Sequence, residues 1–110
     1  MYKLVIIVPR QSVIHSLQEH WPKFLHLAER MPGLVRESHT RPHTYLYGMQ
    51  RLELIQEFYF PDLPALEAAL LSDVGQAAGS MLQEITGGRV TVLIAEHMEA
   101  SLPIEATDAA

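Results

Sequence analysis

The chain contains no cysteine, and this absence excludes several kinds of protein. Without cysteine, its 110 residues have no disulfide framework, no thiolate nucleophile and no cysteine-based zinc site. Basic side chains are also scarce, because 8 Lys and Arg residues stand against 13 Asp and Glu residues and give a net charge of −5. This charge argues against a protein that binds nucleic acid through electrostatic attraction.

The chain also lacks a long hydrophobic run. Its longest uncharged apolar run, residues 4–9, is far too short to span a membrane. No small-residue cleavage site follows this run, so we interpret it as a strand rather than a signal peptide and expect a cytoplasmic protein. However, 48% of the residues are hydrophobic, which is more than a small monomer easily buries. We therefore expect one domain over residues 1–99, a loose tail over residues 100–110, and a partner.

Hydrophobic periodicity predicts an alternation of strands and helices. Pro22 falls inside the first predicted helix, Ser12 is a plausible N-cap for it, and Ser72 begins a second helical stretch. The order is strand 2–8, helix 13–30, strand 34–41, aromatic loop 42–51, strand 52–60, helical stretch 62–85 and strand 89–96. This is an α+β, ferredoxin-like βαββαβ order, with an antiparallel four-stranded sheet and helices on one face.

The third strand alternates so that its two faces differ in polarity. The helix-facing positions are Leu52, Leu54, Phe58 and Phe60, with Gln56 as a misfit, and the opposite positions are Glu53, Ile55, Glu57 and Tyr59. On the last strand, Thr91, Leu93, Ala95 and His97 are the expected partners of that opposite face. The sequence leaves open which parity of the second strand joins Glu57, that of Glu37 and His39 or that of Arg36 and Ser38. A half-apolar face of this kind fits closure by a second copy, which would enclose a ligand-sized cavity.

Several short motifs resemble the EthD-like proteins of the dimeric α/β-barrel superfamily. They are the stretch 57–66 (EFYFPDLPAL) with its continuation at 69–72 and Gly75, the Met-Pro-Gly-Leu at 31–34, and the opening strand 2–5. The resemblance covers about the first 97 residues. It implies ferredoxin-like subunits whose sheets pair into a barrel, with a cleft in each subunit. Members of the superfamily include monooxygenases, decarboxylases, isomerases and stress-response proteins.

The first helix departs from the family pattern. The family usually has Tyr-Trp there, with a histidine four residues later, whereas this chain has Phe24 at the equivalent distance and Trp21 shifted by one residue. The family's histidine role is therefore not transferred. A haem-linked monooxygenase is a weak third reading, since no histidine is fixed as an axial ligand, and we expect no cofactor.

Glu57 is the main catalytic candidate, because a carboxyl group on a covered face would have a raised pKa and could act as a general acid or base. An ion pair across the dimer interface is the alternative role. His39 is the second catalytic candidate, and the predicted substrate-binding residues are Tyr59, Ile55, Trp21 and Tyr45. Histidine spacing fixes no third ligand for a metal, so no metal site is predicted.

The function predicted from these features is that of a homodimer that binds a small, mostly apolar organic molecule in a barrel cleft. The chemistry would be cofactor-independent acid/base or oxidative chemistry, and the enzyme class stays open between an EthD-like oxidoreductase or monooxygenase and a decarboxylase or isomerase. A non-catalytic ligand-binding or structural dimer is the alternative. The expected partners are a second copy and a small-molecule ligand, with no nucleic acid and no membrane.

Overall fold

The computed structural model describes residues 1–10 and 14–103, and it confirms the predicted ferredoxin-like βαββαβ order. The elements are β1 (Tyr2–Pro9), α1 (Ile14–Ala28), β2 (Arg36–Thr40), β3 (Leu52–Phe60), α2 (Leu63–Leu71), α3 (Asp73–Thr86) and β4 (Thr91–Glu96). The predicted cap Ser12, the predicted helix start at residue 13 and residues 104–110 of the predicted tail lie outside the described residues.

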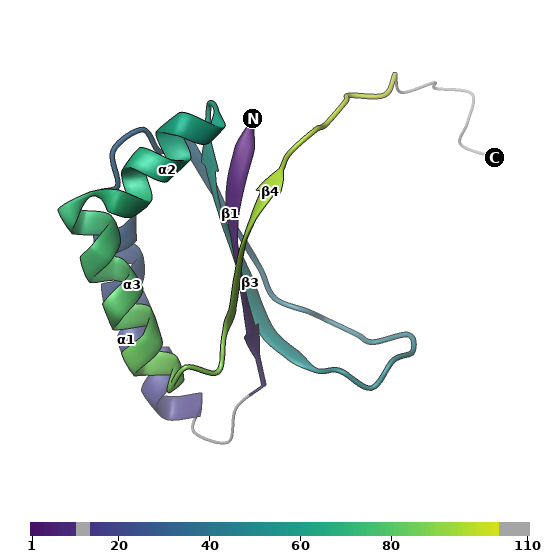
Figure 1. Cartoon of the computed structure of the whole chain (residues 1–110). Helices are drawn as coiled ribbons and strands as arrows, with labels where there is room; N and C mark the ends of the chain where they lie inside the picture. The colour runs from purple at the N-terminus through teal and green to yellow at the C-terminus, as the bar shows by residue number, and fades with distance from the viewer. Residues whose placement is uncertain (11–13, 104–110) are drawn as a thin grey trace.

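The four strands form one antiparallel sheet in the order β2-β3-β1-β4. Helices cover one face of this sheet, and the other face is left uncovered (Figure 1). Within the described chain, no helix is both long enough and apolar enough to cross a membrane.

Local hydrogen bonds explain where the helices begin and end. α1 ends at Ala28, two residues earlier than predicted, because Arg30 N and Met31 N donate to carbonyls three residues back and tighten the last turn. Asp62 caps α2 by accepting from Ala65 N at 2.9 Å. Ser72 ends α2 and caps α3, as the sequence predicts, since its hydroxyl accepts from Gly75 N at 3.0 Å.

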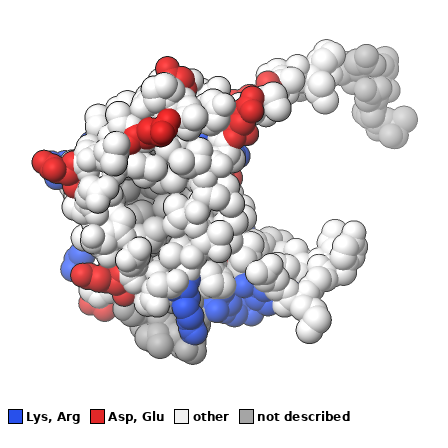
Figure 2. Space-filling model, in the orientation of Figure 1, with Lys and Arg blue, Asp and Glu red and all other residues white. Residues whose placement is uncertain are grey.

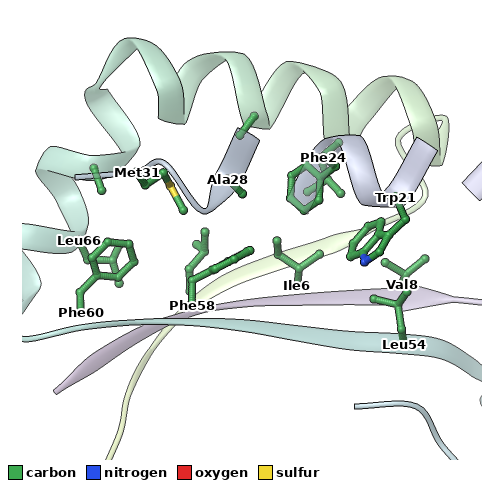
Figure 3. Packing of buried hydrophobic residues seen from close by; sticks show 14 of the residues in the cluster. Ile6, Val8, Trp21, Phe24, Ala28, Met31, Leu54, Phe58, Phe60 and Leu66 are labelled. Carbon is green, nitrogen blue, oxygen red and sulfur yellow. The ribbon is translucent and has the colours of Figure 1, made fainter. Parts of the chain in front are cut away.

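The hydrophobic core lies between the helices and the sheet (Figure 3). Phe58 and Phe60 of β3 are fully buried there, and each such side chain contributes about 1.5–3 kcal/mol to stability. They pack in one cluster with Ile6 and Val8 of β1 and with Trp21, Phe24 and Ala28 of α1. The core therefore fixes which side of each strand faces the helices.

Two segments extend beyond the layers on the side of the sheet away from the helices (Figure 1). We call residues 41–51, between β2 and β3, the loop arm, and residues 97–103, after β4, the tail arm. Leu46, Tyr47 and Met49 of the loop arm are almost fully exposed, as are Met98 and Leu102 of the tail arm. In Figure 2 the two arms flank a concave opening in front of the uncovered sheet face.

The strand register settles the parity that the sequence leaves open. Arg36 and Ser38 of β2 pair with Tyr59 and Glu57 of β3, so these residues share the uncovered face. His39 pairs with Gln56, on the helix side of the sheet. Of the two possibilities that the sequence leaves open, the structure has that of Arg36 and Ser38, and His39, the second catalytic candidate, does not share a face with Glu57.

A β-bulge changes the environment of Glu53. The pairing of β1 with β3 shifts at this end of the sheet, where Val8 pairs with Leu54 and Pro9 with Leu52. Glu53 is the extra residue, and it lines a cavity on the helix side together with Trp21. Strict alternation predicts the opposite side for Glu53, and that prediction is wrong because the bulge interrupts the alternation.

Candidate functional site

A connected polar cluster occupies the uncovered sheet face around the predicted catalytic residue. Lys3 Nζ of β1 lies 2.5 Å from Glu57 Oε2, and the Tyr59 hydroxyl donates to the same oxygen at 3.0 Å. Ser38 Oγ lies 3.2 Å from the Tyr59 hydroxyl. The guanidinium of Arg36 stacks on the Tyr59 ring at 4.3 Å, so Tyr59 is held on several sides.

The cluster extends to the start of the tail arm. His97 packs edge-on against Tyr59, with ring centroids 4.9 Å apart. Glu99 accepts from Arg36 at 3.0 Å and lies 3.5 Å from His97 Nε2. These contacts hold the base of the tail arm against β2, and they explain why Tyr59 is buried although no helix covers its face.

The pKa of Glu57 is lowered, whereas burial alone would raise it. Desolvation favours the neutral carboxyl group, but the hydrogen bonds from Lys3 and Tyr59, the charge of Lys3 and the charge of His97 together outweigh desolvation. Glu57 is therefore a carboxylate at neutral pH, paired within its own subunit. The prediction that burial raises its pKa is wrong, because the sequence does not show that Lys3 faces it.

A mostly apolar cavity lies on the other side of the sheet, between α3 and the strands. Its volume is about 360 Å³, and Figure 2 shows the surface hollowed between α3 and β4. Small residues on α3 leave the space open, since Gly75, Ala78 and Gly79 all line it. The opposite wall is apolar and includes Leu4, Ile6 and Phe58. We call this space the apolar cleft.

A second cavity of about 330 Å³ lies between α1 and the bulged end of β3. Trp21 contributes to its wall and is only 6% exposed. Leu17, Gln18, Pro22, Arg41, Glu53 and Leu54 complete the lining. Phe24 lines the apolar cleft, and its ring packs on Trp21 at 4.9 Å, so this aromatic pair stands between the two cavities. We call the second space the polar pocket.

His39 lies beside the polar pocket rather than beside Glu57. Its Nδ1 atom is 2.8 Å from Gln56 Oε1, and Arg41 Nε donates to its Nε2 atom at 3.3 Å. Because the amide oxygen of Gln56 accepts, Nδ1 carries the proton and Nε2 is the acceptor. The buried Gln56, a misfit in an apolar strand face, is thus explained by its bond to His39.

The remaining predicted substrate-binding residues do not meet at one place. Ile55 is half-buried on the uncovered face with Glu57 and Tyr59. Tyr45 belongs to the loop arm, where its hydroxyl accepts from Leu52 N at 2.6 Å and donates to Leu52 O at 3.1 Å. These bonds, and the Arg51 guanidinium 4.4 Å from its ring centroid, make Tyr45 an anchor of the loop arm. Trp21 lies on the helix side.

Sequence reasoning missed the residues that shape the apolar cleft. Gly75 and Gly79 lie four residues apart and face the cavity from one side of α3. Two glycines at this spacing inside an otherwise apolar helix face are the signal that predicts such a hollow, because each removes a side chain from the same stripe. Among the described residues, no group of three His, Asp or Glu side chains is placed to hold a metal ion.

Comparison with known proteins gives the same fold. No protein-family model matches the chain, and no match is found among curated proteins. An ethyl tert-butyl ether D (EthD) family protein from Bacillus halodurans has a solved structure that is 27% identical, with a TM-score of 0.82 over 89% of this chain and 99% of that one. Because the alignment covers most of both chains, the structural similarity extends over nearly the whole described subunit.

More distant solved structures share the architecture. A dimeric ferredoxin-like protein of unknown function from Jannaschia is 24% identical, with a TM-score of 0.62 over 87% of this chain and 97% of that one. SnoaB, a cofactor-independent oxygenase from Streptomyces nogalater, is 14% identical, with a TM-score of 0.65 over 94% of this chain and 97% of that one. Likeness at these identities shows the fold alone. Together with the topology, the comparisons show a ferredoxin-like fold, and over most of its length this chain is similar to an EthD family protein.

Proposed function

We propose that this protein is a homodimer that binds a small, mostly apolar organic molecule in the apolar cleft of each subunit. The cavity itself is the observation that carries the proposal. Its volume of about 360 Å³ falls in the usual range for small-molecule sites, about 300–1,000 Å³, and its walls are mostly apolar. Gln83 is the polar side chain in this wall, which gives a ligand one group for orientation.

The proposed dimer pairs the uncovered sheet faces of two copies. Val5, Ile7 and Leu93 give the β1 and β4 side of this face an apolar character, and Leu93 is 40% exposed in the single subunit. The loop arm and tail arm flank the face with exposed apolar side chains, which a second copy seated there would cover (Figure 1). The dimeric ferredoxin-like neighbours support this arrangement. A cytoplasmic location stays a prediction from the sequence.

Ligand binding without catalysis is the form of the proposal that the geometry favours. No acidic or basic side chain of the described residues lines the apolar cleft. Glu57 faces the opposite side of the sheet, where Lys3 pairs with it. Acid–base chemistry by Glu57 is the rival proposal, and it requires a ligand held between the two sheets of the dimer.

The proposal is tested with N-phenyl-1-naphthylamine, an uncharged probe whose fluorescence rises in apolar surroundings. A Cβ atom added at Gly79 meets open space, so the side chain of Gly79→Leu fills the cleft without a backbone clash. We expect the wild type to bind the probe and Gly79→Leu to bind it at least tenfold more weakly. Ser80→Leu adds the same side chain at an exposed position of α3 and is the matched control.

Two results would contradict the proposal. Equal probe affinity in the wild type and in Gly79→Leu would remove the cleft as the site, as would wild-type protein that binds no probe. Circular dichroism and sedimentation of both leucine variants show whether the fold and the dimer persist. In a turnover assay, loss of activity in a folded Glu57→Gln variant would instead favour the rival proposal.

A further inference from the structure

Two residues that line the polar pocket each carry a buried polar atom, one a hydrogen-bond donor and one an acceptor, that no other described group satisfies. These atoms are Trp21 Nε1 and Glu53 Oε1, and both are buried. Trp21 is more than nine-tenths buried, and Figure 3 shows its nitrogen on the edge of the ring that faces the sheet. A buried polar atom without a partner lowers stability by about 1–3 kcal/mol, so such a pair calls for an explanation.

Two backbone irregularities meet at the same pocket. Pro22 has no N–H, so the carbonyl of Gln18 lacks its usual helical donor, and both residues line the pocket. On the facing strand, the β-bulge places Glu53 in the pocket wall. Bulges often re-aim a side chain next to a functional site. Helix and strand thus each depart from regular geometry where the cavity lies.

The charges in the pocket wall balance. Arg41 is positive and Glu53 is negative, and both line the cavity. The bonds from Arg41 Nε to His39 and from His39 to Gln56 hold the arginine at the pocket edge. A ligand with a net charge would be attracted by one of these groups and repelled by the other. The pocket therefore favours a neutral ligand with polar character.

Apart from Gln18, the rest of the wall is apolar, and the cavity has the size of a small molecule. Leu17, Leu54 and the rings of Trp21 and Pro22 surround a volume of about 330 Å³. A hydroxyl group is the smallest organic group that both accepts a hydrogen bond and donates one. A single hydroxyl group could therefore accept a hydrogen bond from the indole N–H and donate one to the carboxylate.

We infer that the polar pocket binds a small neutral organic molecule that carries a hydroxyl group on an apolar body. The hydroxyl accepts from Trp21 Nε1 and donates to Glu53 Oε1, while the body packs on Leu17 and Leu54. This site is separate from the apolar cleft, since the Trp21–Phe24 pair stands between them. The inference therefore goes beyond the proposed function and does not depend on it.

The test uses the single tryptophan of the chain as a reporter. In ¹⁵N-labelled full-length protein, Trp21 gives the one indole N–H resonance. We expect benzyl alcohol to shift this resonance saturably and to slow its exchange with solvent. Toluene, which has a similar body without the hydroxyl, should bind at least tenfold more weakly, since a buried donor and acceptor are then left unpaired.

Variants separate this site from the other cavity. Glu53→Met keeps the side-chain length but removes the acceptor, and we expect about tenfold weaker benzyl alcohol binding. Glu67→Met makes the same exchange at an exposed position of α2 and should leave the affinity unchanged, as should Gly79→Leu in the apolar cleft. Equal affinity for benzyl alcohol and toluene overturns the inference, and so does an indole resonance that neither compound moves. If Glu53→Met does not fold, the comparison of the two ligands in the wild type still decides.

Discussion

His39 Nδ1 lies 2.8 Å from Gln56 Oε1, on the helix side of the sheet, while Glu57 faces the other side. The two residues that the sequence predicts as a catalytic pair are thus separated by the thickness of the sheet. His39 is instead connected with the polar pocket through Arg41 and Gln56.

The bond from His39 to Gln56 predicts the tautomer of the histidine. Because the amide oxygen accepts, the neutral ring should carry its proton on Nδ1. Arg41 Nε donates to Nε2 and favours the same form, so long-range ¹H–¹⁵N spectra at pH 8 should show the Nδ1–H form in the wild type and a mixture of both forms in the double variant Gln56→Leu/Arg41→Leu. Gln56 is 1% exposed, and the apolar replacement should change the unfolding free energy by only about 1 kcal/mol, because lost hydrogen bonding is offset by apolar burial. An unchanged tautomer in the double variant would contradict the assigned bonds.

The elements of the fold could be predicted because their signals are local. The caps Asp62 and Ser72 and the alternation of β3 each depend on a few neighbouring residues. The face of His39 could not be predicted, because both parities of β2 mix polar types and only the pairing with β3 decides between them. The face of Glu53 was predicted wrongly because a bulge depends on the pairing of two strands, which the sequence of one strand does not show.

The chemistry of the site was less predictable than its location. The sequence places Glu57 and Tyr59 together on the uncovered face, and the structure confirms this neighbourhood. The sign of the Glu57 pKa shift depends on Lys3, which reaches Glu57 only through the pairing of β1 with β3. Gly75 and Gly79 of α3 are a local signal for the apolar cleft, but its width depends on how far α3 stands from the sheet, which no local pattern encodes.

The lowered pKa of Glu57 predicts an acid-sensitive contribution to stability. The folded state binds the Glu57 proton more weakly than the unfolded state, so the contribution is present above about pH 4.5 and is lost as pH falls through the lowered pKa. Glu57→Gln should therefore lower the unfolding free energy by about 1 kcal/mol at pH 7 and by less at pH 3. Urea denaturation at fixed protein concentration measures both values. Glu67→Gln is the exposed control, and equal losses at the two pH values would contradict the prediction.

Glu37 should titrate near neutrality. Partial burial of its carboxyl group, a hydrogen bond with Glu29 and repulsion by Glu29 raise its pKa from 4.5 to about 7. The folded state holds this proton more tightly, so the contribution to stability is fully present below about pH 4.5 and is lost as pH rises through about 7. A ¹³C carboxyl titration should give a midpoint near 7 in the wild type and a lower one in Glu29→Gln. An unchanged midpoint in Glu29→Gln would exclude Glu29 as a cause of the raised pKa of Glu37.

The proposed dimer predicts a strong effect from one charge on the uncovered sheet face. Leu93 lies on the edge strand β4, opposite Val5 of β1, and belongs to this face. Leu93→Glu would bury a carboxylate between two sheets, and we expect the dimer to dissociate at least a hundredfold more readily. Ala68→Glu places the same charge on the exposed side of α2 and should leave the dimer intact. Sedimentation velocity over a range of concentrations distinguishes these outcomes, and an intact Leu93→Glu dimer would mean that another surface forms the interface.

The two glycines of α3 that line the apolar cleft should respond in opposite ways to alanine. A Cβ atom at Gly75 would clash with the backbone carbonyl of Ala69, where α2 turns into α3, so Gly75→Ala should lower the unfolding free energy by about 1–3 kcal/mol or more. A Cβ atom at Gly79 meets open space, and alanine there should raise the unfolding free energy by about 0.5–1 kcal/mol through better helix propensity. Because both exchanges add the same methyl group to the same helix, their difference measures backbone crowding rather than composition. A Gly75→Ala variant that is as stable as the wild type or more stable would show that the corner between α2 and α3 is looser than the contact of Gly75 indicates. A Gly79→Ala variant that is less stable than the wild type would contradict the open space at Gly79.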